Sequence, residues 1–236
     1  MVRDAVGRFG VDLVPYRSPR HAIGRRLRVL GALGVDLVID VGANSGQYGR
    51  ELRACGYRGQ ILSFEPLSGP YAILERRAHG DPAWDIVRLA IGSEAGRKRL
   101  NVAANGGASS SFLSMLALHE LNAPEARFVS VEEVAMQRLD VAAARSVADA
   151  RSPFLKVDVQ GYELEVLRGA AGILDRVVAM QLEMSLAPLY HDGPLFGDLL
   201  TEVSGLGFEL VGLEPGFAAV DGRLLQVDGL FARKTW

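Results

Sequence analysis

The chain has 236 residues, a formal net charge of −2 and one cysteine, Cys55. This length fits one large domain, and 49% hydrophobic with 23% charged residues excludes intrinsic disorder. A lone cysteine excludes an internal disulfide and a thiolate metal cage, and the charge argues against a nucleic-acid partner. No apolar run approaches the ~20 residues of a membrane span, and no secretory signal is recognisable. We therefore expect a cytoplasmic protein.

Residues 1–34 are predicted to form a basic, helical N-terminal segment that precedes the main domain. Residues 1–30 hold seven arginines and two aspartates, a local net charge of +5. Apolar residues recur there at the three- and four-residue spacing of an amphipathic helix, namely Ile23, Leu27, Leu30 and Leu33. The opposite, solvated face is expected to carry Arg25, Arg26 and Arg28. The stripe either packs on the domain or a second subunit, or residues 1–33 contact the inner face of an anionic membrane.

Residues 35–236 are predicted to form one domain in which strands and helices alternate. Strands are expected at 35–41, 60–64, 84–91, 154–159 and 177–184, and helices at 45–55, 68–78, 163–174 and 195–206. A strand is also indicated at 128–138, and 208–213 with 224–233 should form a closing hairpin. Such alternation predicts a mostly parallel sheet with helices on both faces. Ligands bind such sheets beyond the carboxyl ends of the strands.

The first candidate binding segment is DVGANSG at residues 40–46, directly after the first strand. A glycine-rich turn at this place lets the backbone approach a ligand closely. The dinucleotide fingerprint G-x-G-x-x-G is absent, and Asp40 would repel a pyrophosphate. The acidic residue instead favours a ligand with an ammonium and a sulfonium group, such as S-adenosylmethionine. The candidate residues are Asp40, Gly42, Asn44 and Gly46.

Glu65, in the segment FEP, lies 25 residues after Asp40 at the end of the second strand. A carboxylate at this position can accept hydrogen bonds from both ribose hydroxyls of a nucleoside. We therefore predict that Glu65 binds the ribose of the same ligand.

Three further residues are candidates for proton transfer. Asp158 ends the strand FLKVDV, and unpaired buried acids are rare in structural roles. Glu183 ends the next strand, and His191 follows in a loop, with an ordinary pKa near 6.5 that suits proton transfer. Asp158 is the first candidate for a general base, Glu183 the second and His191 the third. A Mg²⁺ or Ca²⁺ site built from these acids and Glu163 is the less favoured alternative.

Together these segments resemble the FkbM family of S-adenosylmethionine-dependent methyltransferases. The matching stretches span about 195 residues, in order: VIDVGANSGQYG (38–49), FEP (64–66), LAIGSEAG (89–96), the serines 109–111, FLKVDVQGYELEVLRGA (154–170), QLEMSLAPLY (181–190) and LLQVDGLFAR (224–233). The KVDVQGYE stretch is the most specific of them.

The resemblance implies a class I methyltransferase fold: an α/β, Rossmann-like, mostly parallel seven-stranded sheet with an antiparallel closing strand. It implies methyl transfer to a hydroxyl of a small molecule, typically a sugar of a glycolipid or glycosylated natural product, or a polyketide. By position, loop 40–46 resembles the methionine-binding loop and Glu65 the ribose clamp. Ala90 would lie near the adenine, and the serines 109–111 look like a pocket-lining segment.

Three other functional classes are weighed against this interpretation. A nicotinamide-dependent oxidoreductase would need the absent G-x-G-x-x-G loop. An RNA methyltransferase would need a basic face with interleaved aromatic residues. A non-catalytic S-adenosylmethionine-binding relative would lack the acids Asp158 and Glu183, which are present. The sequence leaves the oligomeric state open, a homodimer included.

Overall fold

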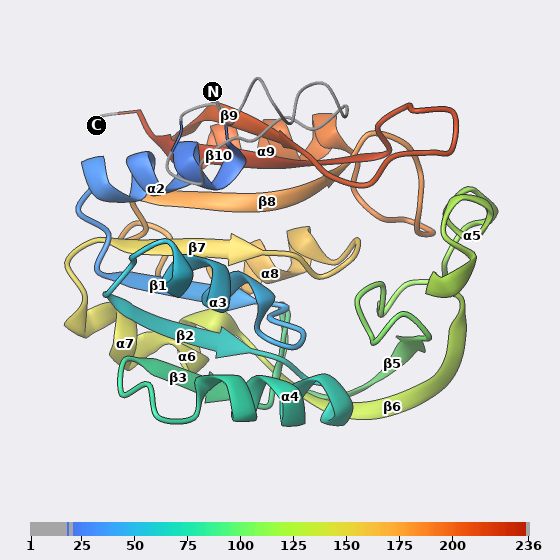
Figure 1. Cartoon of the computed structure of the whole chain (residues 1–236), viewed down its shortest axis with the longest axis horizontal. Helices are drawn as coiled ribbons and strands as arrows, with labels where there is room; N and C mark the ends of the chain where they lie inside the picture. The colour runs from blue at the N-terminus through green and yellow to red at the C-terminus, as the bar shows by residue number, and fades with distance from the viewer. Residues whose placement is uncertain (1–17, 19–20, 235–236) are drawn as a thin grey trace, which may run out of the picture.

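A computed structural model describes residues 18 and 21–234 of the chain. Its centre is a seven-stranded sheet in the order β3-β2-β1-β7-β8-β10-β9 (Figure 1). β3, β2, β1, β7 and β8 run parallel, whereas β10 lies antiparallel between β8 and β9. This confirms the predicted mostly parallel sheet and its antiparallel closing hairpin. The strands are β1 (Leu37–Val41), β2 (Gln60–Phe64), β3 (Trp84–Val87), β7 (Pro153–Val157), β8 (Ala179–Ser185), β9 (Phe208–Pro215) and β10 (Gln226–Arg233).

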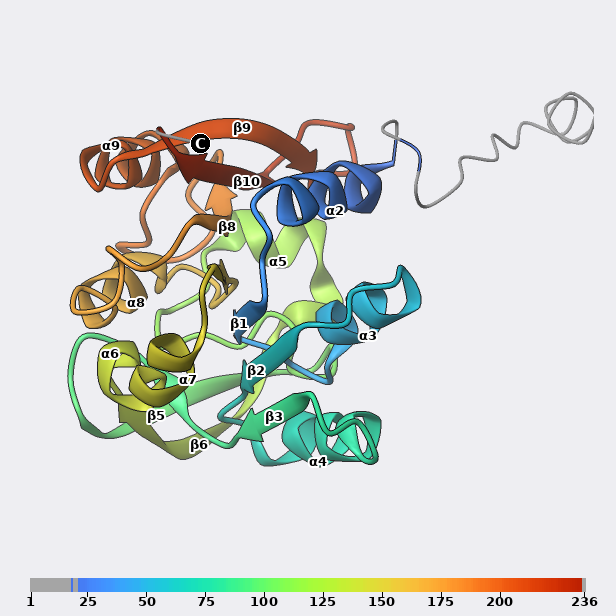
Figure 2. The ribbon, with the colours of Figure 1, turned by 90° about the vertical axis from the view of Figure 1, so that its left-hand side faces the viewer.

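Helices cover both faces of the sheet, as Figure 2 shows edge-on. One face carries α2 (Ala22–Ala32), α3 (Gln47–Ala54) and α4 (Ser68–Ala78). The other carries α6 (Leu139–Ala142), α7 (Ala144–Asp149), α8 (Glu163–Gly169) and α9 (Phe196–Gly205). β1 and β7 are buried along their whole length because apolar residues point to both covered faces.

A second, three-stranded sheet stands beside the carboxyl ends of the central strands (Figure 1). It contains β4 (Ala90–Ile91), β5 (Gly96–Ala103) and β6 (Phe128–Gln137), in the order β4-β6-β5. The short helices α5 (Ala117–Asn122) and η1 (Pro124–Ala126) connect β5 to β6. The strand predicted at 128–138 is therefore confirmed, but it belongs to this second sheet.

The single strand predicted at 84–91 is wrong, because the chain changes sheets within it. β3 pairs with β2 in the central sheet, whereas β4 pairs with β6. Between them, the Arg88 guanidinium lies 2.7 Å from the Glu132 carboxylate of β6. The hydrophobic pattern of residues 84–91 cannot show this change of partner strand, since β3 and β4 both have the composition of a strand.

The helix predicted in the N-terminal segment is confirmed as α2, and it packs on the sheet. Ile23 and Leu30 are buried, with Leu27 and Leu33 partly buried beside them. The apolar stripe is thus covered by protein and not free to enter a membrane. The prediction that Arg26 is solvated is wrong, since it is 6% exposed. The rest of the predicted membrane-contact segment, 1–17, 19 and 20, lies outside the described residues.

Within residues 18 and 21–234, no helix is long and apolar enough to span a bilayer.

Candidate functional site

Two polar rows cross the sheet on the face that carries α2, α3 and α4. The first row is in register on β2, β1, β7 and β8 and consists of Ser63, Asp40, Lys156 and Gln181. The second lies two residues further along, at the carboxyl ends of the parallel strands. It runs through Glu65, Gly42, Asp158, Glu183, Asp228 and Glu214. Parallel register therefore brings together acids that are far apart in the sequence.

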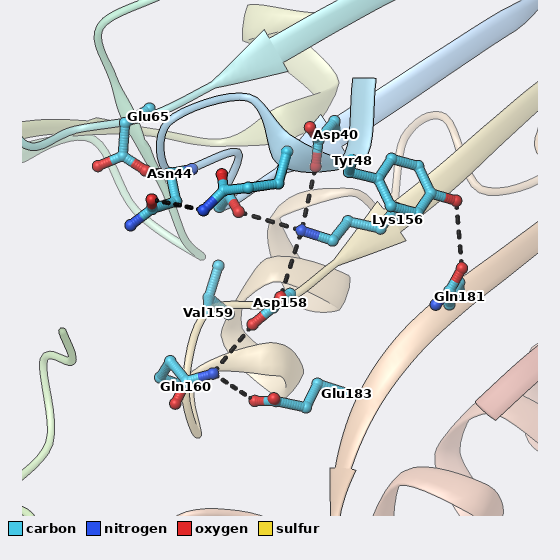
Figure 3. Close-up of polar contacts among 12 residues, drawn as sticks. Asp40, Asn44, Tyr48, Glu65, Lys156, Asp158, Val159, Gln160, Gln181 and Glu183 are labelled. Carbon is cyan, nitrogen blue, oxygen red and sulfur yellow. Dashed lines mark hydrogen bonds and ion pairs between the residues drawn. The ribbon is translucent and has the colours of Figure 1, made fainter. Parts of the chain in front are cut away.

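Lys156 is the buried cation at the centre of these rows (Figure 3). Its Nζ lies 3.1 Å from Asp40 Oδ1 and 3.4 Å from Asp158 Oδ2, and it donates to the Gly42 carbonyl at 3.0 Å. Burial by itself would lower the pKa of Lys156, but the two carboxylates raise this pKa above its usual value. Lys156 is therefore a fixed positive charge at neutral pH.

Gln160 joins Asp158 to Glu183. Its Nε2 donates to Asp158 Oδ1 at 3.0 Å and to Glu183 Oε2 at 2.6 Å (Figure 3). Its own carbonyl Oε1 accepts from the Tyr190 hydroxyl at 2.7 Å. Gln160 adopts a φ of 57°, a strained value for a residue with a side chain. Burial, then repulsion from Asp158, raises the pKa of Glu183 well above its usual value.

The loop after β1 is shaped by two residues. Gly42 has a φ of 77°, and a Cβ there would meet the Asp158 carbonyl oxygen at 1.9 Å, so only glycine fits. Glu65 Oε2 accepts from the Asn44 backbone N–H at 2.8 Å, and Oε1 accepts from the Leu67 N–H at 2.9 Å. Burial raises the pKa of Glu65 to about 7, although these two hydrogen bonds oppose the shift.

A cavity of about 490 Å³ opens above these rows, within the usual range for ligand pockets. Its walls fit S-adenosylmethionine at the end near β2 and β4. Each Glu65 oxygen uses one lone pair on the backbone and keeps another for a ribose hydroxyl. Apolar side chains beside it suit an adenine ring, and they come from Leu89, Ala90, Ile91, Leu100 and Phe112.

The segment with the three serines forms one wall of this cavity, as predicted. Gly107, Ala108 and Ser110 line the cavity. The segment is attached at both sides, because Asn44 Nδ2 donates to the Gly106 carbonyl at 3.1 Å and Ser111 Oγ donates to the Gln160 carbonyl at 2.7 Å.

The cavity brings together five of the nine predicted site residues, and it is lined by Gly42, Asn44, Glu65, Ala90 and Asp158. The other four are not among its lining residues. Asp40 is fully buried beside Lys156, and Gly46 directly precedes α3 with a φ of 83°. Glu183 is partly buried on β8 and accepts a hydrogen bond from Gln160. His191 is exposed and pairs with Asp192 at 2.8 Å.

No group of three or more His, Cys, Asp or Glu within the described part of the chain is arranged to hold a metal ion. Glu163, the third acid of the alternative metal site, accepts from the N–H groups of Val159 and Gly161 at 3.2 and 3.1 Å. Its carboxylate is therefore engaged by the backbone turn that follows β7.

Further cavity-lining residues are not among those the sequence singled out as site residues. They include Arg26, Tyr48, Lys156, Gln160, Gln181 and Asp228. A polar residue at alternate positions of an apolar strand is the signal that could have identified Lys156 and Gln181. For Arg26 the signal is helical spacing, since it lies three residues after Ile23 and four before Leu30 and so shares the face of the apolar stripe.

Comparison with known families identifies the chain. The model of the methyltransferase FkbM domain matches residues 40–210. The chain belongs to the FkbM methyltransferase family. Its cofactor is S-adenosylmethionine, as the sequence predicts. No curated protein matches the chain.

Solved structures with a similar fold include three methyltransferase-related proteins. Sp1610 of Streptococcus pneumoniae in complex with S-adenosyl-L-methionine is 13% identical, with 89% of this chain and 72% of that chain covered and a TM-score of 0.45. An rRNA methylase from Streptococcus thermophilus is 13% identical, covering 89% and 96%, with a TM-score of 0.45. The methyltransferase domain of bacterial CtHen1 is 9% identical, covering 89% and 96%, with a TM-score of 0.49. None of these matches bears on the acceptor of this FkbM methyltransferase.

Proposed function

We propose that this FkbM methyltransferase transfers a methyl group to a hydroxyl oxygen of a small molecule, a sugar of a glycolipid or glycosylated natural product. The observation that carries the proposal is the place of Asp158. It lies on the cavity wall in the middle of the second polar row, and Lys156 and Gln160 hold its two oxygens. A carboxylate fixed in this way can accept a proton from an acceptor hydroxyl. We also propose the cytoplasm as its compartment, on the sequence grounds given above.

The donor end of the cavity is proposed to hold S-adenosylmethionine. Glu65 would bind the ribose hydroxyls, and the backbone of Gly42 would approach the methionine portion, since no side chain stands there. Ala90 would contact the adenine. When bound, this cofactor supplies a methyl group that a sulfonium already activates.

The chain's own contribution to the reaction is alignment and proton transfer. Holding two reactants in line at close approach supplies many kcal/mol of the rate enhancement. Asp158 Oδ atoms would take the hydroxyl proton as the acceptor oxygen becomes nucleophilic. Lys156, which stays protonated and lines the same cavity, would balance the negative charge that develops there.

A transfer assay tests the proposal, with isotopically labelled methyl donor and a panel of hydroxylated glycolipids and polyketides. The expected product carries the label on an oxygen of a sugar ring. Label on a polyketide oxygen would support the alternative acceptor, and label on nitrogen would contradict O-methylation. Binding of the donor without transfer to any acceptor would favour a non-catalytic relative.

The role of Asp158 gives the first prediction. Asp158→Asn is expected to reduce turnover at least ~10²-fold, because general-base catalysis is worth about 10²–10⁴-fold. Asp192→Asn, which changes an exposed acid, is the matched control. Turnover near wild type in Asp158→Asn would remove this residue from the mechanism. Loss of activity in EDTA that Mg²⁺ restores would replace the general base with a metal site.

A further inference from the structure

Arg26 is a buried arginine on the cavity wall, at the end away from Glu65. It comes from α2, and its Nη2 donates to Glu214 Oε2 at 2.5 Å. Nη1 donates to Glu51 Oε2 at 3.3 Å, and the guanidinium lies 4.8 Å above the Tyr48 ring. Contacts from two elements, α3 and β9, therefore fix the plane of this side chain.

The Nε donor of Arg26 is unused. Its Nε is buried and has no hydrogen-bond partner within the described part of the chain. A buried polar group without a partner costs free energy, and structures tolerate it where a ligand completes the bond. Arg26 is 6% exposed and lines the cavity, and its Nε is a buried donor beside the cavity wall.

The sheet order places Asp228, and the strand β9 that holds Arg26 through Glu214, far from the donor end. Glu65 follows β2, and Asp228 lies on β10, with β1, β7 and β8 between these two strands. Neighbouring strands are about 4.8 Å apart, so Glu65 and Asp228 are separated by about 19 Å across the sheet. Asp158, after β7, lies between them. The cavity therefore has a donor end at Glu65 and an opposite end at Arg26, Gln181 and Asp228.

Charges at this opposite end disfavour an anion. Arg26 is already paired with Glu214 and Glu51, and Lys156 is paired with two other acids. Burial, then repulsion from Asp158, raises the pKa of Asp228 to about 6, so Asp228 is mostly ionised at neutral pH. A phosphate group would meet this carboxylate without an unpaired cation nearby. Hydroxyl groups could donate to Asp228 and accept from Arg26 Nε.

Two of the three residues at this end lie outside the residues that the family model matches. The family match covers residues 40–210, whereas Arg26, Glu214 and Asp228 lie outside that range. Residues 40–210 supply the donor end, Asp158 and Gln181, whereas α2 and β10 supply Arg26 and Asp228.

We propose that Arg26, Gln181 and Asp228 form the acceptor end of the cavity and that this end binds hydroxyl groups of an uncharged acceptor in preference to a phosphorylated one. This rests on the function proposed above. Arg26 acts as a specificity-determining residue, oriented by Glu214.

The test uses the full chain saturated with S-adenosylhomocysteine. Binding of methyl β-D-glucopyranoside and of glucose 6-phosphate is titrated by saturation-transfer NMR. The neutral sugar should bind more tightly than the phosphate. Arg26→Lys keeps a cation for Glu214 but lacks Nε, so it should weaken methyl glucoside binding about tenfold, as one lost charge-assisted hydrogen bond predicts.

Controls separate the acceptor end from the donor end. Arg28→Lys, on the exposed side of α2, should leave sugar binding unchanged. Arg26→Lys should remain folded and keep the wild-type affinity for S-adenosylhomocysteine. Failure of the wild-type chain to bind S-adenosylhomocysteine would contradict the proposed function itself. Normal binding of that ligand with no sugar binding, tighter binding of glucose 6-phosphate, or an Arg26→Lys chain that binds the sugar normally would each overturn the acceptor-end proposal alone.

Discussion

Lys156 is the residue that allows acids to gather at the centre of the sheet. Asp40 is fully buried on a neighbouring strand, and an uncompensated buried carboxylate would destabilise the fold by several kcal/mol. The ammonium of Lys156 offsets this cost and also contacts the Gly42 carbonyl. One side chain therefore links the buried core of the sheet to the shape of the donor loop.

Glu65 gives a prediction about donor binding. Glu65→Ala is expected to weaken S-adenosylmethionine binding by ~1.5–3 kcal/mol, because two charge-assisted hydrogen bonds to the ribose are lost. Isothermal titration calorimetry measures this change. Glu75→Ala, an exposed change on α4, should have wild-type affinity. Equal affinity of Glu65→Ala and wild type would remove Glu65 from the donor site.

Glu163 gives a prediction about pH. Burial raises its pKa from 4.5 to about 7, against hydrogen bonds from the backbone. The folded chain thus holds this proton more tightly than the unfolded chain, so its contribution to the free energy of unfolding falls as pH rises from about 4.5 to about 7. Glu163→Gln cannot ionise and should gain about 1–3 kcal/mol over wild type at pH 8 but not at pH 4.5.

Urea denaturation at both pH values measures the effect of Glu163→Gln. Glu75→Gln, at an exposed position, is the control for removal of one carboxylate. If Glu163→Gln and wild type lose stability equally between the two pH values, the carboxyl of Glu163 does not titrate in the proposed range.

The sequence predicts the position of a site residue when that residue belongs to a motif or directly follows a strand. Asp158 and Glu65 follow apolar strands, so their place at the sheet edge follows from the strand pattern alone. Arg26 and Asp228 could not be found in this way. Their place at the cavity depends on how α2 and β10 pack, which is decided by contacts between the two ends of the described chain.

Among the elements, α3 is held against the sheet by a close contact with Trp84. Gly49 faces the indole, and a Cβ there would meet Trp84 Cζ2 at 2.3 Å. The indole cannot easily move, because its Nε1 donates to Ser63 Oγ at 3.0 Å within the core. The small residue is therefore required by packing and not by helix propensity.

Gly49→Ala is expected to lower the free energy of unfolding by about 1–3 kcal/mol, the usual cost of overpacking. The matched control is Gly31→Ala in α2, where no heavy atom lies within 4 Å of the added Cβ. Gly31→Ala should stabilise the chain by about 0.5–1 kcal/mol, because alanine loses less conformational freedom in a helix. Urea denaturation measures the free energy of unfolding of both variants. Equal changes in Gly49→Ala and Gly31→Ala would contradict the packing role of Gly49.

The ends of helices are less well predicted by the local sequence pattern than their presence. The helix predicted at 163–174 ends at Gly169, where a Cβ would lie 1.9 Å from the Gly92 carbonyl oxygen. That contact joins α8 to the segment after β4, and no local pattern in either segment indicates it. A tertiary contact, and not helix propensity, therefore decides which residues near this helix end can be replaced.

For the whole molecule, α2 is part of the same packed unit as the sheet. Leu30 is 3% exposed within a cluster that includes Val38 and Phe154. Leu30→Ala should lower the free energy of unfolding of the entire chain by about 2–4 kcal/mol, in one transition. Leu121→Ala, at a position 75% exposed on α5, should have little effect. A wild-type urea midpoint for Leu30→Ala would mean that α2 folds independently of the domain.

The position of β10 has a consequence for how the chain is made. In the central sheet, β9 pairs only with β10, which the ribosome synthesises later. While residues up to 225 emerge, β8 and β9 are present but cannot join, and the acidic end of the cavity has no Asp228. A growing chain therefore holds two unsatisfied strand edges, of the kind that invites wrong pairing. Pairing of β10 joins β8 to β9 and also places Asp228 on the cavity wall, so the central sheet and this wall depend on the same strand.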